Sequence, residues 1–107
     1  MIKNIDDFNN FIKEKEGVLA YFSTKNCSVC KVLKPKIKEM LSEKYPKIEF
    51  VYIDSEEIPE IPAQLSIFAA PTLIVFLDGK EFLRKSRNIG LNELENEISR
   101  PYNLFFT

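Results

Sequence analysis

The stretch Asn26-Cys27-Ser28-Val29-Cys30 holds both cysteines of the chain and decides how the rest is interpreted. Residues 18–22 before it are apolar and short enough for a buried strand, and residues 31–44 after it have apolar side chains at helical spacing. Cys27 is therefore expected at or just before a helix start, where free backbone N–H groups and the helix dipole favour a thiolate. A second thiol one turn later can attack any mixed disulfide that the first one forms. The pattern predicts a redox-active cysteine pair.

Length and composition indicate one ordinary globular domain covering residues 1–107. The chain has 107 residues, of which 45% are hydrophobic and 29% charged. Two cysteines are too few for the disulfide scaffold of a small secreted module, and a net charge of −1 predicts no attraction to nucleic acid or anionic membranes. The first residues lack the apolar core of a signal peptide, and no apolar run of about 18 residues follows. We therefore expect a cytoplasmic protein without membrane contact.

Hydrophobic patterning and turn residues predict the remaining elements. An amphipathic helix capped by Asn4 or Asp6 is expected to end at Gly17, Pro35 to kink the helix after the cysteines, and Pro101 to end the last helix. Residues 2–4 are expected to add a short strand and residues 63–67 a short helix. The main strands are expected at residues 18–23, 48–53, 72–77 and 80–87, with an Asp78-Gly79 hairpin turn and a last amphipathic helix after Gly90. The buried stripe of the helix after the cysteines is expected to consist of Val29, Leu33, Ile37, Met40 and Leu41.

The order of these elements defines the fold class. A strand, a helix and a second strand make a right-handed unit with parallel strands, and the hairpin adds antiparallel strands. The strongly charged segment 80–87 is suited to a sheet edge. We expect an α/β fold with a central mixed sheet, made of a parallel βαβ half and an antiparallel hairpin, and helices on both faces.

These features resemble the thioredoxin family over nearly the whole chain. Cys27 matches the nucleophile of the family, and Cys30 matches its resolving cysteine. Ala70-Pro71-Thr72 matches the segment in which the family carries a cis-proline, and Pro35 matches its helix-kinking proline. Asp78-Gly79-Lys80 matches its hairpin, and Gly90 matches a glycine beside its substrate groove. The resemblance implies the thioredoxin fold.

The same resemblance implies an activity, a site and partners. The activity is thiol–disulfide oxidoreduction, in which protein disulfides are reduced by dithiol exchange at Cys27 and Cys30 without a cofactor or metal. The residues expected to contact the substrate are Asn26, Ala70, Pro71 and Gly90. The expected partners are disulfide-containing proteins and a recycling reductase such as a thioredoxin reductase, and the protein is expected to act as a monomer.

The chain also departs from the family pattern. Asn26 stands where the family usually has a tryptophan, and Ser28-Val29 replaces the usual pair between the cysteines. Tyr21 and Phe50 occupy the positions of the family's buried aspartate and its lysine partner. Because that pair is absent, no evident general base helps to deprotonate Cys30. We therefore expect slower resolution of the mixed disulfide or a different pH dependence.

Other interpretations of the sequence stay open. The fold can serve as a non-catalytic binding module, or the protein can be a dedicated electron donor to one enzyme. The cysteines can also form an inert disulfide or contribute to a metal site or an iron–sulfur cluster shared between two chains. The acidic residues Asp54, Glu56, Glu57 and Glu60 are interpreted as a surface loop, and the aromatic tail 102–106 is expected to pack back on the sheet or the last helix.

Overall fold

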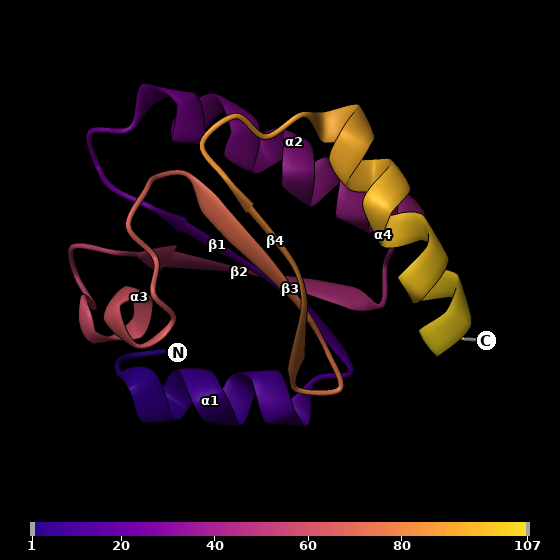
Figure 1. The fold of residues 1–107 in the computed structure, drawn as a ribbon, viewed down its shortest axis with the longest axis horizontal. Coiled ribbons are helices and arrows are strands. Elements are labelled where there is room, and N and C mark those ends of the chain that lie inside the picture. Colours follow the sequence, from indigo (N-terminus) through magenta and orange to yellow (C-terminus); the bar gives the residue numbers. More distant parts are fainter. Residues whose placement is uncertain (1, 107) are drawn as a thin grey trace.

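The computed structural model describes residues 2–106, which form the helices and strands labelled in Figure 1. The helices are α1 (Ile5–Glu14), α2 (Ser28–Lys44), α3 (Glu60–Gln64) and α4 (Leu91–Phe105). The strands are β1 (Gly17–Ser23), β2 (Ile48–Asp54), β3 (Thr72–Leu77) and β4 (Lys80–Ser86). Each strand lies within one residue of its predicted bounds.

The strands form one mixed sheet in the order β2-β1-β3-β4. β1 pairs in parallel with β2 because α2 crosses between them, and the other two pairings are antiparallel. The turn between β3 and β4 has positive φ angles at both Asp78 (54°) and Gly79 (76°), as a two-residue hairpin turn requires. The predicted fold class is confirmed.

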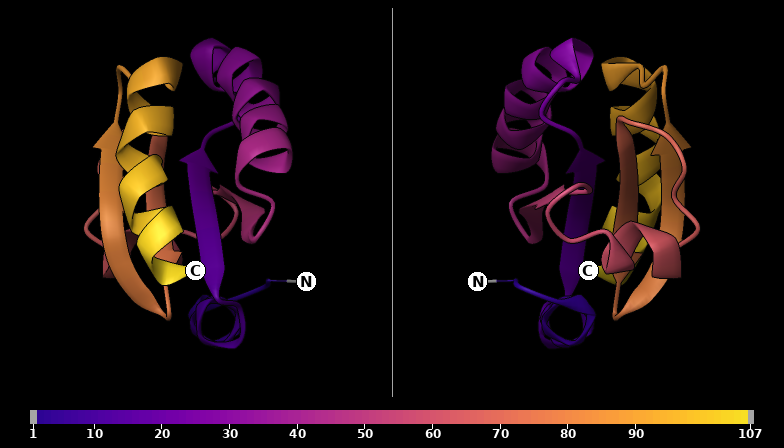
Figure 2. Two further views of the ribbon diagram at one scale, coloured as in Figure 1. Left: turned by 90° about the vertical axis from the view of Figure 1, so that its right-hand side faces the viewer. Right: turned by 90° about the vertical axis from the view of Figure 1, so that its left-hand side faces the viewer.

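Helices cover both faces of the sheet (Figures 1 and 2). Alternate residues of the central strand β1 point to opposite faces: Leu19 and Tyr21 pack under α2 and α4, whereas Ala20 and Phe22 pack over α1 and α3. All residues of β1 and β3 are buried, which explains why these two strands are continuously apolar. β2 and β4 form the edges and are partly exposed.

Four predicted boundaries are wrong. Residues 2–4 lie outside the sheet, and Asn4 instead caps α1 by accepting a hydrogen bond from the Asp7 amide at 2.8 Å. α1 ends at Glu14, and Gly17 already belongs to β1. The short helix spans 60–64 instead of 63–67, because the proline at position 62 falls in the first helical turn, where backbone N–H groups have no partner within the helix.

The fourth wrong boundary is the end of the last helix, because α4 continues through Pro101 to Phe105. The aromatic tail explains this. The ring of Tyr102 lies 4.8 Å from that of Tyr45 and 4.7 Å from that of Phe106, so the last turn packs against the end of α2. This packing offsets the hydrogen bond that Pro101 removes. The tail is thus part of the last helix: Tyr102 and Phe106 pack back on the core, whereas Leu104 and Phe105 are 71% and 40% exposed.

No helix within residues 2–106 combines the length and the apolarity that are needed to cross a membrane.

Candidate active site

Three loops that are distant in the sequence meet at one end of the sheet. β1 leads from this end into Cys27, and the pairing of Phe22 with Thr72 places Pro71 at the same level. β4 also ends here, because its last residue pairs with Thr72, and the chain then continues to Gly90. The topology thus brings the cysteine pair, the predicted proline and the predicted glycine to the same end of the sheet.

The two cysteines form a disulfide at the first turn of α2, with their Cα atoms 5.3 Å apart. Cys27 is the N-cap residue, and its Sγ accepts a hydrogen bond from the Cys30 amide at 3.2 Å. Cys27 is half-buried, whereas Cys30 is only 3% exposed. After reduction, the free N–H groups of the helix start stabilise negative charge on Cys27, which is also the sulfur that a substrate can reach.

The peptide bond between Ala70 and Pro71 is cis, as the family resemblance implied. The Pro71 carbonyl accepts a hydrogen bond from the Arg87 amide at 2.8 Å. The Thr72 hydroxyl donates to the Ala69 carbonyl at 2.7 Å and lies 3.1 Å from the Ser86 hydroxyl. The proline segment is therefore fixed to the end of β4.

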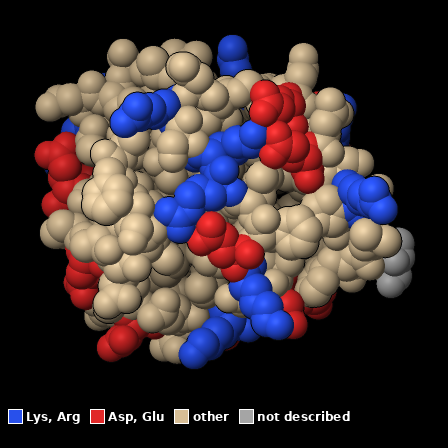
Figure 3. All heavy atoms as spheres, in the orientation of Figure 1, with Lys and Arg blue, Asp and Glu red and all other residues tan. Residues whose placement is uncertain are grey.

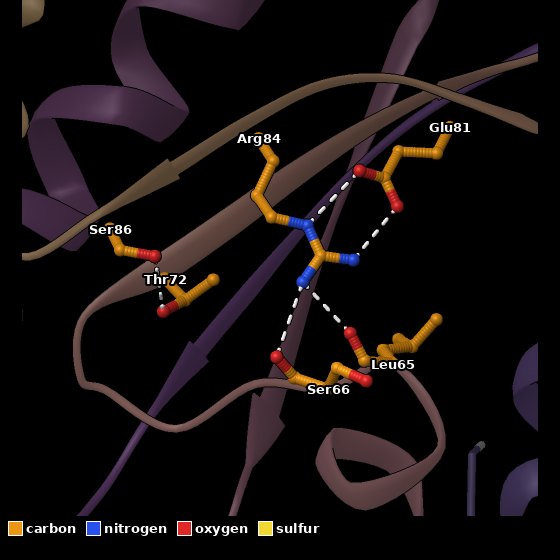
Figure 4. Close-up of polar contacts among 6 residues, drawn as sticks. All are labelled: Leu65, Ser66, Thr72, Glu81, Arg84 and Ser86. Atoms are coloured by element: carbon orange, nitrogen blue, oxygen red, sulfur yellow. Dashed lines mark hydrogen bonds and ion pairs between the residues drawn. The ribbon is translucent and has the colours of Figure 1, made fainter.

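An arginine on β4 holds the other end of this segment (Figure 4). Arg84 donates to the Leu65 carbonyl at 2.8 Å, and both of its remaining guanidinium nitrogens contact the carboxylate of Glu81. The Arg84 guanidinium lowers the pKa of the Glu81 carboxyl. The charged β4 was predicted only as an exposed edge, so its role as a clamp for residues 65–72 is additional.

A groove of about 650 Å³ lies beside the disulfide, between the first turns of α2 and the loop Arg87–Gly90. Gly90 lines this groove, whereas Asn26, Ala70 and Pro71 are not among its lining residues. Sequence reasoning missed Val32, Lys36 and Arg87, which do line it.

The groove also corrects the predicted buried stripe of α2. Ile37, Met40 and Leu41 are buried, but Val29 is 60% exposed, because at this level the helix faces the loop before α4 across the groove and not the sheet. The spacing of positions 29, 32 and 36 on one helix face is the signal that could have identified the α2 side of the groove.

An aromatic layer occupies the place of the family's buried acid–base pair. Tyr21 is fully buried, with its ring 6.0 Å from that of Phe50 and 6.4 Å from that of Tyr52. Its hydroxyl donates to the Cys30 carbonyl at 3.2 Å. Burial, with a smaller effect of Tyr52, raises the pKa of Tyr21 to about 12. Residue 21 is therefore a hydrogen-bond donor at neutral pH and not a base.

A second cavity, of about 300 Å³, reaches the buried Cys30 from the side of β2. Ser23, Tyr52 and Lys34 line it, and the Lys34 ammonium lies 4.0 Å from the centre of the Tyr52 ring. No carboxylate occurs among its lining residues, all of which the structure describes.

The four acidic residues at and just after the end of β2 differ in exposure. Glu56, Glu57 and Glu60 are exposed, but Asp54 is buried as the last residue of β2 and accepts the Glu56 amide at 2.9 Å, so its predicted place in a surface loop is wrong. Within residues 2–106, no three histidine, cysteine or acidic side chains converge in an arrangement that holds a metal ion.

A disulfide at the amino end of a helix, level with a cis-proline on a mixed sheet, defines the site of a thiol–disulfide oxidoreductase. Comparison with known proteins agrees. The family model described as Thioredoxin matches residues 1–100. The thioredoxin-like protein YdfQ of Bacillus subtilis (strain 168) is 31% identical over 104 residues, which are 97% of this chain and 92% of that protein.

Solved structures show the same likeness. Fasciola hepatica thioredoxin superimposes with a TM-score of 0.81 and 29% identity, covering 92% of this chain and 94% of that one. Oxidised mitochondrial thioredoxin 3 of Saccharomyces cerevisiae gives a TM-score of 0.82 and 26% identity, covering 92% of this chain and 91% of the other. The chain belongs to the thioredoxin family, and its activity is thiol–disulfide exchange with the Cys27–Cys30 disulfide as its redox group.

Proposed function

We propose that the protein reduces disulfide bonds of other proteins, with Cys27 as nucleophile and Cys30 as resolving cysteine. The observation that carries this assignment is the asymmetry of the pair. The Cys27 sulfur caps α2, accepts the Cys30 amide and is partly accessible, whereas Cys30 is buried behind it. A helix N-terminus lowers the pKa of a thiol, so Cys27 is the thiolate that attacks first.

The exchange proceeds in two balanced steps. The Cys27 thiolate attacks one sulfur of the substrate disulfide, forms a mixed disulfide and releases the other sulfur as a thiolate. Cys30 loses its proton to solvent and attacks the Cys27 sulfur, which forms the Cys27–Cys30 disulfide and releases the second substrate thiolate. Two electrons pass to the substrate, whose thiolates take up protons from water.

The substrate segment is proposed to lie along Ala70 and Pro71. The backbone of Ala70 makes no hydrogen bond with any other described residue, so it is free to pair with an extended chain like an added strand. Pro71 has no N–H group that would need a partner. Asn26, exposed beside Cys27, and Gly90, which lines the groove, complete this surface.

Single-turnover exchange tests the roles of the two cysteines. The pre-reduced protein is mixed with a disulfide-bonded protein substrate, and the products are alkylated and identified by mass. Cys30→Ser should accumulate a mixed disulfide through Cys27, and Cys27→Ser should lose nearly all exchange while remaining folded. If Cys27→Ser exchanges as fast as wild type, the assignment is wrong. Partner binding without any exchange would favour a binding module.

We also propose a thioredoxin reductase as the recycling partner, a monomeric state and a reducing compartment such as the cytoplasm. Both cysteines form the redox pair, so no further disulfide of this chain depends on an oxidising compartment. Turnover with NADPH and a thioredoxin reductase tests the recycling, and sedimentation tests the monomer. If one enzyme oxidises the reduced protein rapidly while general disulfides turn over slowly, the result would favour a dedicated electron donor.

A further inference from the structure

We propose that the groove beside the disulfide selects substrate segments in which aliphatic and acidic side chains flank the reactive cysteine. This inference rests on the proposed function and adds the substrate class. The occupant is an extended segment of a disulfide-bearing protein. The groove of about 650 Å³ begins at Ser28, directly after Cys27, so a segment bonded to Cys27 enters it within a few residues.

The floor of the groove is apolar. Val29 and Val32, one turn apart on α2, are 60% and 59% exposed, and the half-buried Leu33 and Ile89 continue the surface. Aliphatic side chains of a docked segment can cover these valines and so remove apolar surface from water, which favours binding.

The rim of the groove is basic. Lys36 stands one turn beyond Val32, and Arg87 stands on the opposite wall. The Arg87 amide is bound to the Pro71 carbonyl at 2.8 Å, which fixes this residue beside the site. None of the lining residues, all within the described chain, is acidic. Figure 3 shows basic groups among neutral ones over the start of α2 and the loop before α4, with acidic groups beside them over the first turns of α4.

Neither of these two cations forms a direct ion pair with another described residue. No ion pair joins Lys36 or Arg87 to a carboxylate within 4.0 Å. The nearest carboxylates lie outside the groove lining: Lys36 also lines a neighbouring hollow with Glu39, Glu43 and Glu95, and Glu93, near Gly90, is paired with Lys85. A carboxylate of the substrate that enters the groove therefore meets two unpaired cations across an apolar floor, and this arrangement favours acidic over basic segments.

The test compares peptides in single-turnover exchange with the pre-reduced protein. The peptides share one mixed disulfide and two leucines and differ only in two flanking positions, which are both glutamate, both glutamine or both lysine. The glutamate peptide should react about 3- to 10-fold faster than the lysine peptide at low ionic strength, and the ratio should fall toward one in 0.5 M salt. Hydroxyethyl disulfide, which is small and neutral, reports the intrinsic exchange rate.

The variant Lys36→Gln/Arg87→Asn removes both charges and keeps asparagine at position 87, where φ is 63°. It should lower the glutamate-to-lysine ratio at least threefold, after each peptide rate is divided by the hydroxyethyl disulfide rate of the same protein. Lys13→Gln, an exposed lysine on α1 at the opposite face, is the matched control and should keep the wild-type ratio.

An unchanged ratio in the double variant, or equal rates for all three peptides with wild type, would overturn the proposal while leaving the exchange activity intact. Sedimentation that shows a wild-type dimer, lost in the double variant, would assign the groove to a second copy and overturn it as well. Failure to exchange even hydroxyethyl disulfide would refute the proposed function itself.

Discussion

Replacing Tyr21 with phenylalanine is expected to lower stability at neutral pH but to remove a loss of stability at alkaline pH. The Tyr21 hydroxyl is fully buried and donates one neutral hydrogen bond, at 3.2 Å, to the Cys30 carbonyl. Loss of such a bond costs about 1 kcal/mol of unfolding free energy. At pH 8 the oxidised wild type should therefore be more stable than Tyr21→Phe by about this amount.

At alkaline pH the ionisation of Tyr21 acts in the opposite direction. Its pKa is raised to about 12 in the folded protein, mainly by burial, and returns to about 10 on unfolding. The stabilisation is complete below pH 10 and is lost as the pH rises toward 12, because the unfolded state releases the proton first. At pH 11 this costs the wild type about 1.4 kcal/mol and leaves Tyr21→Phe unaffected, so the two stability curves should cross.

Urea unfolding of the oxidised proteins between pH 8 and pH 11, followed by far-UV circular dichroism, measures both effects. Lysine deprotonation in this range affects both proteins equally and cancels in the difference. Tyr102→Phe is the control, and it should keep the wild-type loss of stability at alkaline pH because it retains Tyr21. A stability difference between wild type and Tyr21→Phe that stays constant across this range would refute the reasoning.

Three further predictions concern packing and ion pairs elsewhere in the fold and at the proline segment. Gly17→Ala should destabilise the protein by about 1 to 2 kcal/mol in urea unfolding, because its new Cβ would lie 3.2 to 3.3 Å from atoms at the start of β2 and at the end of α4; equal or greater stability would contradict this. Arg84→Met should speed amide hydrogen exchange in residues 65–70 while β1 stays protected, and unchanged exchange there would argue against the clamp. Lys85→Met removes contacts of 2.7 and 2.6 Å to Glu93 and Glu97 and should cost less than about 1 kcal/mol, with the cost declining in 0.5 M salt; a cost that does not respond to salt would point to packing instead.

The sheet and the location of the cysteine pair could be predicted because local signals and tertiary structure agree there. Residues 72–77 are continuously apolar because β3 is a central strand that is buried on both faces. The Asp78-Gly79 turn requires positive φ at both positions, which this pair of residues tolerates. Cys27 caps α2, as expected from its place between an irregular segment and the start of a helix.

The predictions that failed depend on contacts between residues far apart in the chain. Pro101 is a local stop signal, but the packing of Tyr102 against Tyr45 keeps α4 intact beyond it. Val29 follows the helical spacing of a buried stripe, yet it lies opposite a loop that only the folded topology brings near. Arg87 carries no sequence signal for the site, because only the folded chain brings it to the groove and to the Pro71 carbonyl, which accepts a hydrogen bond from its amide.

The aromatic layer has a consequence for the second step of the exchange. No carboxylate lines the cavity at Cys30 among the residues described, so no side chain in this cavity is placed to act as a general base for the Cys30 thiol. The mixed disulfide on Cys27 should therefore persist longer than it would beside a buried acid–base pair. Where the mixed disulfide returns to reactants faster than Cys30 resolves it, the groove contacts of each substrate determine how often the second step is reached, and the proposed contacts with Lys36 and Arg87 then add to discrimination by the sulfur chemistry.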